Sequence, residues 1–178
     1  MIRDLDHVIF TEEEISARVK ELGAELTKEY EGKFPLFVGV LKGSFVFMAD
    51  IVRAVNINCE VDFMGTSSYS NGTSSTGAVK ITKDLTRDIE GRHIVIIEDI
   101  LDSGISLSYL KKYLETRNPA SIRICTLLNK ISRRKAAIEA DYVGFECPDD
   151  FVVGYGLDYA EKYRNLPYIG VLKPEIYS

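Results

Sequence analysis

The sequence predicts an α/β fold with a mostly parallel central sheet flanked by helices. Two apolar runs rich in β-branched residues, at 36–41 and 94–97, have the pattern of strands buried on both faces. Amphipathic stretches alternate with strand-like runs through the first two-thirds of the chain, which favours right-handed crossovers and parallel strands. Shorter strand-like segments near the C-terminal end add a small β-rich part.

The chain has 178 residues and a formal net charge of −5. This length suits a single domain over residues 1–178, since we find no linker or internal repeat. The negative charge argues against nonspecific nucleic-acid binding, which needs a basic face. Cys59, Cys125 and Cys147 lie in or beside apolar stretches, so we expect buried free thiols. No window approaches about 18 apolar residues, and we therefore expect a cytoplasmic protein without a membrane partner.

The first clear helix is predicted to begin after Thr11. Its hydroxyl can cap the helix while the carboxylate of Glu14 returns the bond, which is a capping box. Apolar residues at three- and four-residue steps then form one stripe that packs on the core: Ile15, Val19, Leu22 and Leu26. Gly32 is expected to end the helix.

A small-residue loop, Lys42-Gly43-Ser44, separates the strand at 36–41 from a helix predicted at 45–54. It is either an anion-binding loop whose amides face a phosphate, or a surface lysine beside a turn glycine. A third strand is predicted at 59–64. The hydroxyl-rich segment 65–77 then predicts a long loop, which is typical of a lid or of a disordered segment.

Acidic residues cluster where the apolar run 94–97 ends. The carboxylates of Glu98, Asp99 and Asp102 suit hydroxyl donors or a metal ion, and the glycine turn that follows offers backbone N–H groups to a phosphate. Ligands of open α/β sheets bind at the carboxyl ends of strands. The stretch ending at Ser106 therefore suits a ribose 5-phosphate, and an ordinary strand–turn–helix is the alternative.

The second half of the chain continues the pattern. A helix is predicted after Gly104 from three leucines at helical spacing: Leu107, Leu110 and Leu114. A strand at 121–128 brings Asn129-Lys130 to its carboxyl end, on the ligand side if the strand is parallel. The basic run 133–135 is expected on a solvated surface. Short strands are predicted at 142–145, 151–155 and 169–172.

The segment 95–106 resembles the signature of the type I phosphoribosyltransferases, enzymes that bind 5-phosphoribosyl-1-pyrophosphate (PRPP). Further motifs occur in the order expected of the hypoxanthine-guanine phosphoribosyltransferase family: Leu41–Ser44, Ser68-Tyr69, Leu127–Lys130, Val143–Glu146 and Phe151–Tyr159. The resemblance covers nearly the whole chain. It implies the type I phosphoribosyltransferase fold, with a small hood built from terminal segments. Ser103 is a departure, because many members have threonine there, but both residues supply a hydroxyl.

The resemblance implies roles toward the sugar and the pyrophosphate. Glu98 and Asp99 would hold the ribose hydroxyls, directly or through Mg²⁺. One short segment would cradle the 5-phosphate: Asp102, Ser103, Gly104, Ile105 and Ser106. Pyrophosphate would be bound by Lys42, Gly43 and Arg164, and the resemblance associates a cis peptide with Leu41-Lys42.

The resemblance also implies roles toward the purine. Asp102 would be the general base or proton acceptor near N7, and Lys130 would donate to the six-oxo group. Phe151 would stack on the base and Val152 would meet its edge through the backbone. Asp158 would lie at the purine site and serve a second magnesium, which gives Glu98, Asp99 and Asp158 as metal ligands. Ser68 and Tyr69 would belong to a lid.

These implications amount to purine salvage, in which PRPP and hypoxanthine or guanine give IMP or GMP and pyrophosphate, with Mg²⁺ as cofactor. A xanthine-preferring enzyme is one alternative. A non-catalytic PRPP- or nucleotide-sensing regulator is another, although a sensor has no need of Asp102 together with Lys130. A receiver-like protein ranks low, because Lys42 precedes the acidic pair. The resemblance suggests homodimers or homotetramers, with PRPP and an oxopurine base as the small-molecule partners.

Overall fold

The computed structural model describes the backbone of residues 1–71 and 74–178, and the side chains outside 68–78. A six-stranded sheet has the order β4-β3-β2-β5-β6-β7. Its strands are β2 (Leu36–Leu41), β3 (Glu60–Asn71), β4 (Ser74–Lys83), β5 (His93–Leu101), β6 (Ser121–Asn129) and β7 (Tyr142–Glu146). All neighbours in this sheet are parallel except β3 and β4, which confirms the predicted mostly parallel α/β architecture.

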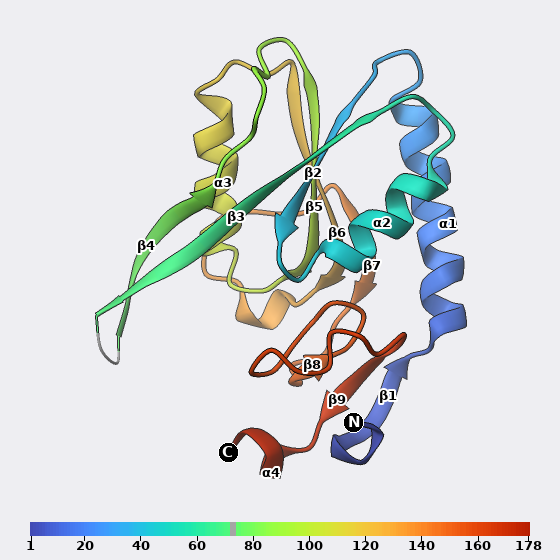
Figure 1. The fold of residues 1–178 in the computed structure, drawn as a ribbon, viewed down its shortest axis with the longest axis vertical. Helices are drawn as coiled ribbons and strands as arrows, with labels where there is room; N and C mark the ends of the chain where they lie inside the picture. The colour runs from blue at the N-terminus through green and yellow to red at the C-terminus, as the bar shows by residue number, and fades with distance from the viewer. Residues whose placement is uncertain (72–73) are drawn as a thin grey trace.

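Helices cover both faces of this sheet (Figure 1). The helices α1 (Glu12–Glu29) and α2 (Phe45–Ala54) lie on one face, and α3 (Ile105–Glu115) lies on the other. The capping box at Thr11 and Glu14 is present, and the predicted leucine and valine stripe of α1 is buried. The helix ends at Glu29 rather than at Gly32, which lies in the following turn with a φ of +74°.

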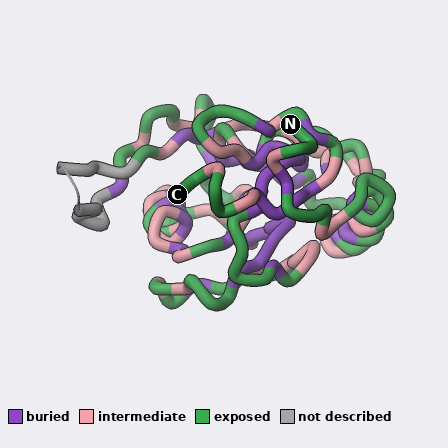
Figure 2. Tube along the Cα trace, turned by 90° about the horizontal axis from the view of Figure 1, so that it is seen from below, coloured by how far each residue is buried: buried purple, intermediate pink, exposed green. Residues whose placement is uncertain are grey.

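The central strands are buried on both faces, as their apolar runs predict. In β2, Phe37 packs into the core beneath α1 and α2, whereas Val38 packs into the core beneath α3. In β5, Val95 and Ile96 divide in the same way. Figure 2 shows the resulting buried stretches running through the middle of the molecule. A sheet filled on both sides leaves only its strand ends available for a ligand.

The prediction of a loop over 65–77 is wrong for the described backbone. Strands β3 and β4 form an antiparallel ribbon in which Ser68 pairs with Val79 and Asn71 pairs with Ser74. Residues 72 and 73 lie outside the described residues. Hydroxyl-rich sequences lack the apolar alternation that marks a strand, and here backbone pairing between neighbouring segments supplies the order instead.

A second, three-stranded sheet lies below the carboxyl ends of the parallel strands in Figure 1. It has the order β1-β9-β8, with β1 (Leu5–Phe10), β8 (Val152–Val153) and β9 (Ile169–Leu172). We call this sheet and the segment 154–168 the hood. Both ends of the described chain lie beside it, with the short α4 (Pro174–Tyr177) following β9 (Figure 1). The expected hood of terminal segments is thus present, although β1 and α4 had no sequence signal.

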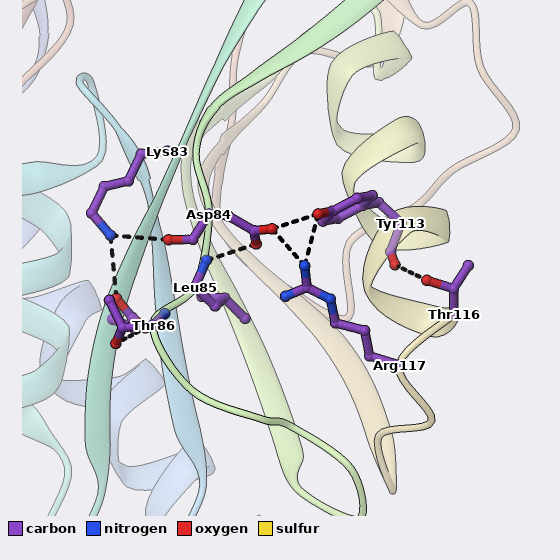
Figure 3. A network of polar contacts seen from close by, with 8 residues as sticks. Lys83, Asp84, Leu85, Thr86, Tyr113, Thr116 and Arg117 are labelled. Carbon is purple, nitrogen blue, oxygen red and sulfur yellow. Dashed lines mark hydrogen bonds and ion pairs between the residues drawn. The ribbon is translucent and has the colours of Figure 1, made fainter.

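A polar network fastens the loop that follows β4 to the C-terminal end of α3 (Figure 3). The Asp84 carboxylate accepts hydrogen bonds from the Tyr113 hydroxyl and the Arg117 guanidinium. Burial alone would raise the pKa of Asp84, but the hydrogen bonds from Arg117 and Tyr113 outweigh it and lower the pKa. The network therefore stabilises the fold as an ion pair between Asp84 and Arg117.

All three cysteines are free thiols. Cys125 and Cys147 are buried, as predicted, whereas Cys59 is only partly buried at the start of β3. Burial raises the pKa of the Cys147 thiol to about 11. Within the described residues, every helix is too short or too polar to cross a lipid bilayer.

Candidate active site

An acidic pair occupies the carboxyl end of β5. Glu98 and Asp99 are both partly buried, and the Asp99 amide donates a 3.1 Å hydrogen bond to Glu98 Oε1. Burial, and then the neighbouring Asp99 carboxylate, raise the pKa of Glu98 well above its ordinary value. Two carboxylates held this close favour a cation between or beside them. A positive charge there would offset both the cost of burying the charged carboxylates and the repulsion between them.

The loop after β2 lies against this acidic pair. A Cβ atom at Gly43 would overlap Oδ2 of Asp99, so any larger residue here would displace the Asp99 carboxylate. The peptide bond between Leu41 and Lys42 is cis, as expected. The structure thus brings together two motifs that lie more than fifty residues apart in the sequence, the lysine loop and the acidic pair.

The N-terminus of α3 forms a neutral cradle beside the acidic pair. Gly104 precedes the helix with a φ of +79°, a conformation that favours glycine. The amide of Ile105 donates to Ser103 Oγ at 3.4 Å, and Ser106 lies in the first turn. Backbone N–H groups at such a turn and helix N-terminus suit a phosphate.

A cavity of about 320 Å³ opens next to this cradle. Its lining includes every residue that the sequence assigns to the purine: Asp102, Lys130, Phe151, Val152 and Asp158. Ile100, Leu157 and Tyr177 contribute apolar and aromatic surface. The cavity therefore combines an exposed carboxylate, an ammonium group and ring-sized apolar walls.

Lys130 enters this cavity from the end of β6. Only 7% of the residue is exposed, and its Nζ donates a 2.7 Å hydrogen bond to the backbone oxygen of Asp150. Its amide donates to the Leu101 oxygen at 2.9 Å, which fixes it beside the end of β5. An ammonium group with three donors keeps capacity for a ligand oxygen after making this one bond.

Aromatic rings form one wall of the cavity. Phe151 stacks on Tyr177, with ring centroids 4.7 Å apart and planes 21° apart. Tyr159 meets the Phe151 ring edge-on, with a centroid distance of 5.6 Å. Phe151 is 36% exposed, so part of its ring remains available to a planar ligand.

Charged residues of the hood meet the lysine loop. The Arg164 guanidinium lies 3.4 Å from Asp158 Oδ1 and 3.2 Å from Glu161 Oε1, and Nη1 donates to the Gly156 oxygen at 2.7 Å. Glu161 also pairs with Lys42 Nζ at 3.4 Å. The two cations expected to bind pyrophosphate thus share one carboxylate. These cations, and then burial in the opposite direction, leave the pKa of Glu161 lowered.

Tight backbone packing sets the hood's distance from the lysine loop. Gly156 has a φ of +99°, and a Cβ atom there would overlap the Gly43 backbone oxygen. The Tyr155 hydroxyl donates to the Asp50 carboxylate on α2, which ties the same turn to the main sheet's helices. The two halves of the candidate site are therefore held together by direct contacts.

The two residues expected to form a lid, Ser68 and Tyr69, lie outside the side chains that the structure describes. Ser68 and Tyr69 belong to β3, on the ribbon that β3 forms with β4. Their side chains fall within 68–78, outside the side chains that the structure describes.

Sequence reasoning missed three residues of this region. Tyr177 and Glu161 gave no signal, since neither belongs to a recognisable motif. Arg134 was expected on a solvated surface with its neighbours, and this is wrong: only 10% of its side chain is exposed. Its spacing four residues after Lys130 is the one sequence feature that could have drawn attention to it.

The carboxylates present are compatible with Mg²⁺. Among the described residues, no cluster of three or more His, Cys, Asp or Glu side chains could hold a metal by itself. Mg²⁺ usually uses one or two carboxylates together with substrate phosphates and water. The pair at Glu98 and Asp99 matches this donor set.

Comparison with known proteins places the chain in a family. Residues 9–160 match the family model described as a phosphoribosyl transferase domain. The whole chain is 61% identical to a hypoxanthine-guanine phosphoribosyltransferase of Bacillus subtilis (strain 168), covering 99% of it. It is 55% identical to the protein of the same name in Staphylococcus aureus (strain Mu50), again covering 99%.

A solved structure agrees with these matches. The crystal structure of a hypoxanthine phosphoribosyltransferase from Staphylococcus aureus superposes with a TM-score of 0.97 at 55% identity, covering 100% of this chain and 97% of that one. On fold, on sequence and on the family model, the chain belongs to the hypoxanthine-guanine phosphoribosyltransferase family of phosphoribosyl transferases.

Proposed function

We propose that this chain transfers the 5-phosphoribosyl group of PRPP to hypoxanthine or guanine, giving IMP or GMP and pyrophosphate. One observation supports this most: Asp102 and Lys130 line the same cavity as Phe151, next to the N-terminal cradle of α3. A base placed there would lie within reach of a proton acceptor, a donor and an aromatic face. The names of its relatives from Bacillus subtilis and Staphylococcus aureus agree with this activity.

The residues that line the cavity would favour six-oxo purines. Lys130 would donate to the six-oxo oxygen, and Phe151 would stack on the ring while the backbone of Val152 meets its edge. The six-amino group of adenine would place a donor against the Lys130 ammonium. A site built around such a hydrogen bond can reject the mismatched base by several orders of magnitude.

The sugar and its phosphate would lie at the end of β5. Glu98 and Asp99 would accept hydrogen bonds from the ribose hydroxyls. The segment Asp102–Ser106 would surround the 5-phosphate with backbone N–H groups and the hydroxyls of Ser103 and Ser106.

The pyrophosphate would lie between the lysine loop and the hood. Lys42, the amide of Gly43 and Arg164 would stabilise the negative charge that develops on it as the glycosidic bond breaks. Arg164 Nε is buried without a hydrogen-bond partner among the described residues, which leaves the guanidinium with unused donor capacity. Glu98 and Asp99, and Asp158 at a second position, would hold Mg²⁺, which supplies neutralisation of leaving-group charge.

Proton transfer completes the reaction. As N9 of the oxopurine bonds to the anomeric carbon, the base must lose a proton, and the Asp102 carboxylate would accept it at N7. Positive charge builds on the ribose ring meanwhile, and water would intercept this species. A lid that includes Ser68 and Tyr69 would exclude that water.

Incubation with PRPP, Mg²⁺ and each of four bases tests this function. Nucleotide should form with hypoxanthine and guanine and not with adenine. Formation of nucleotide with xanthine alone would point to the xanthine-preferring enzyme. No nucleotide from any oxopurine, together with tight PRPP or nucleotide binding, would point to the regulator.

We propose further that the chain acts as one phosphoribosyltransferase unit, cytoplasmic, and assembles as a homodimer or homotetramer. Light scattering on the purified protein measures the assembly. A monomer at the concentrations used for the activity assay would contradict it.

A further inference from the structure

The three consecutive basic residues after β6 lie in different environments. Arg133 pairs with Asp149 at the surface, with Nε 2.7 Å from Oδ1, and Lys135 is exposed. Arg134 instead extends inward, and only 10% of its side chain is exposed. A buried guanidinium needs partners for its five donors, so its contacts indicate what it does.

The partners of Arg134 are mostly carbonyl oxygens around the phosphate cradle. Its Nε donates to the Asp102 oxygen at 3.1 Å, and Nη2 donates to the Leu101 oxygen at 3.4 Å. Nη1 donates to the Ile138 oxygen at 2.8 Å. The guanidinium therefore bridges the end of β5 and Ile138, which lies four residues after Arg134 in the sequence.

Two further contacts complete this arrangement. Nη2 of Arg134 donates to the side-chain oxygen of Asn129, which is 4% exposed at the end of β6. Nη1 lies 3.1 Å from Glu139 Oε1, an exposed carboxylate. One planar group therefore joins the ends of β5 and β6, from which Asp102 and Lys130 enter the cavity.

The backbone next to Arg134 holds the same cradle from its other side. The amides of Lys135 and Ala136 both donate to the Ser103 oxygen, at 2.8 and 3.0 Å. A Cβ atom at Gly104 would lie 2.5 Å from Cγ2 of Ile138 and 3.2 Å from Cδ of Arg134. The segment 134–138 is therefore packed directly against the turn that precedes α3.

We propose that Arg134 is a positioning residue for the reaction: its guanidinium holds the Asp102–Ser106 segment so that the cradle receives the 5-phosphate and Asp102 faces the purine. This rests on the proposed function. Arg134 touches no reacting atom and acts through the backbone oxygens of Leu101 and Asp102. Those carbonyls accept hydrogen bonds from the guanidinium, so the backbone that carries Asp102 is fixed from the side of segment 134–138.

Lysine can replace arginine only in part in this role. The guanidinium is a planar fork whose separate nitrogens reach Asp102, Ile138 and Leu101 at once. An ammonium group on a shorter stem can satisfy part of that set. A shift of about 1 Å in a positioning element can cost about 10²-fold in rate.

Steady-state kinetics of Arg134→Gln and Arg134→Lys test this proposal. We expect Arg134→Gln to raise the KM for PRPP and to lower kcat, each by about tenfold or more, with the KM for hypoxanthine within twofold of wild type. Arg134→Lys should recover part of the PRPP affinity. Lys135→Gln is the matched control, because it removes the neighbouring charge and keeps the amide that donates to Ser103.

Comparing the change in the KM for PRPP with the change in the KM for hypoxanthine distinguishes a positioning role from a general effect on stability. A merely structural role would reduce the fraction of active enzyme, and thus kcat, while leaving both KM values unchanged. That result, or wild-type kinetics in Arg134→Gln, would overturn the proposal. If wild type itself makes no nucleotide from any oxopurine, the proposed function fails instead.

A second variant covers the case in which Arg134→Gln does not fold. Ile138→Ala removes the methyl group that lies against Gly104 and leaves the guanidinium in place. We expect a smaller rise in the KM for PRPP, about threefold, with the melting temperature recorded beside it. An unchanged KM for PRPP in a folded Ile138→Ala, with Arg134→Lys also like wild type, would overturn the proposal.

Discussion

The Lys130 ammonium group donates a 2.7 Å hydrogen bond to the Asp150 backbone oxygen, the residue immediately before Phe151. The proposed donor to the base is thus fastened to the start of the proposed stacking wall. This contact joins the end of β6 to the segment that leads into β8 of the hood, across 20 residues of sequence. The proposed base donor and the start of the proposed stacking wall are therefore linked through one side chain.

Lys130→Met keeps a stem of similar length and removes the donor. A hydrogen bond to a charged group contributes about 1.5–3 kcal/mol, so we expect the KM for hypoxanthine to rise by about 10- to 100-fold. The KM for PRPP should stay within threefold, because the cradle does not include Lys130. Initial-rate measurements with each substrate varied give both constants. An unchanged KM for hypoxanthine would remove Lys130 from the base site.

Asp102→Asn replaces the proposed proton acceptor with an amide of nearly the same shape. We expect kcat to fall by about 10²–10⁴-fold, since that is the usual contribution of a general base. Both KM values should change little. The matched control is Asp88→Asn, an exposed aspartate in the turn before β5. Turnover of Asp102→Asn within a few-fold of wild type would assign the proton to another acceptor.

Glu161→Gln releases the two cations that share its carboxylate, Lys42 and Arg164. Because these are the cations that we propose bind pyrophosphate, the Glu161 carboxylate would compete with that ligand for them. Exposed ion pairs are worth about 0.2–1 kcal/mol, so the KM for PRPP should fall by no more than about fivefold. Glu31→Gln, another exposed glutamate, controls for the charge change.

The effect of Glu161→Gln should depend on salt. Pairs between exposed charges weaken as ionic strength rises, so the difference from wild type should shrink at high salt. Measuring the KM for PRPP at low and high ionic strength gives the comparison. A higher KM for PRPP in the variant would mean that Glu161 orders the site for substrate.

Asp84→Asn tests the network in Figure 3 through stability rather than activity. The pKa of Asp84 is lowered in the folded protein, so its ionised form stabilises the fold above the unfolded pKa of about 3.9. That contribution to stability is lost as the pH falls through the pKa that Asp84 has in the folded protein. The variant should therefore melt at a lower temperature than wild type at neutral pH.

The same gap in melting temperature should narrow below about pH 4, because wild type then loses the charge as well. Thermal melts from pH 3 to pH 7 provide the curve, and Glu90→Gln on the exposed turn beside it provides the control. A gap that stays constant with pH would mean that packing, rather than the Asp84 charge, carries the contribution.

Sequence patterns predicted the parts of the fold whose cause is local. The apolar run 94–97 needs burial on both faces whatever surrounds it, and Thr11 caps α1 with a residue three positions away. β1 was missed because its partner β9 lies near the other end of the sequence, and only Leu5 of its six residues is buried. Long-range pairing of this kind leaves little mark on the local pattern.

The candidate site also has a part that the local sequence predicts and a part that depends on long-range contacts. The residues from Glu98 to Ser106 are contiguous, so the complete motif can be recognised in the sequence. Glu161 meets Lys42 across 119 residues. Arg134 is held by backbone oxygens at the end of β5 and just after it, which no side-chain pattern records. A charged residue looks the same in a sequence whether water or backbone oxygens surround it.

The pairing of β1 with β9 has a consequence for the order in which the molecule is made. β9 follows every other strand in the chain, so the hood sheet cannot close until residues 169–172 have been synthesised. The parallel strands through β7 and their helices are all available earlier. A nascent chain can therefore build the proposed sugar-phosphate half of its site before the hood that carries the proposed purine wall has closed. Closure of a contact this distant in sequence is also expected to be a slow folding event.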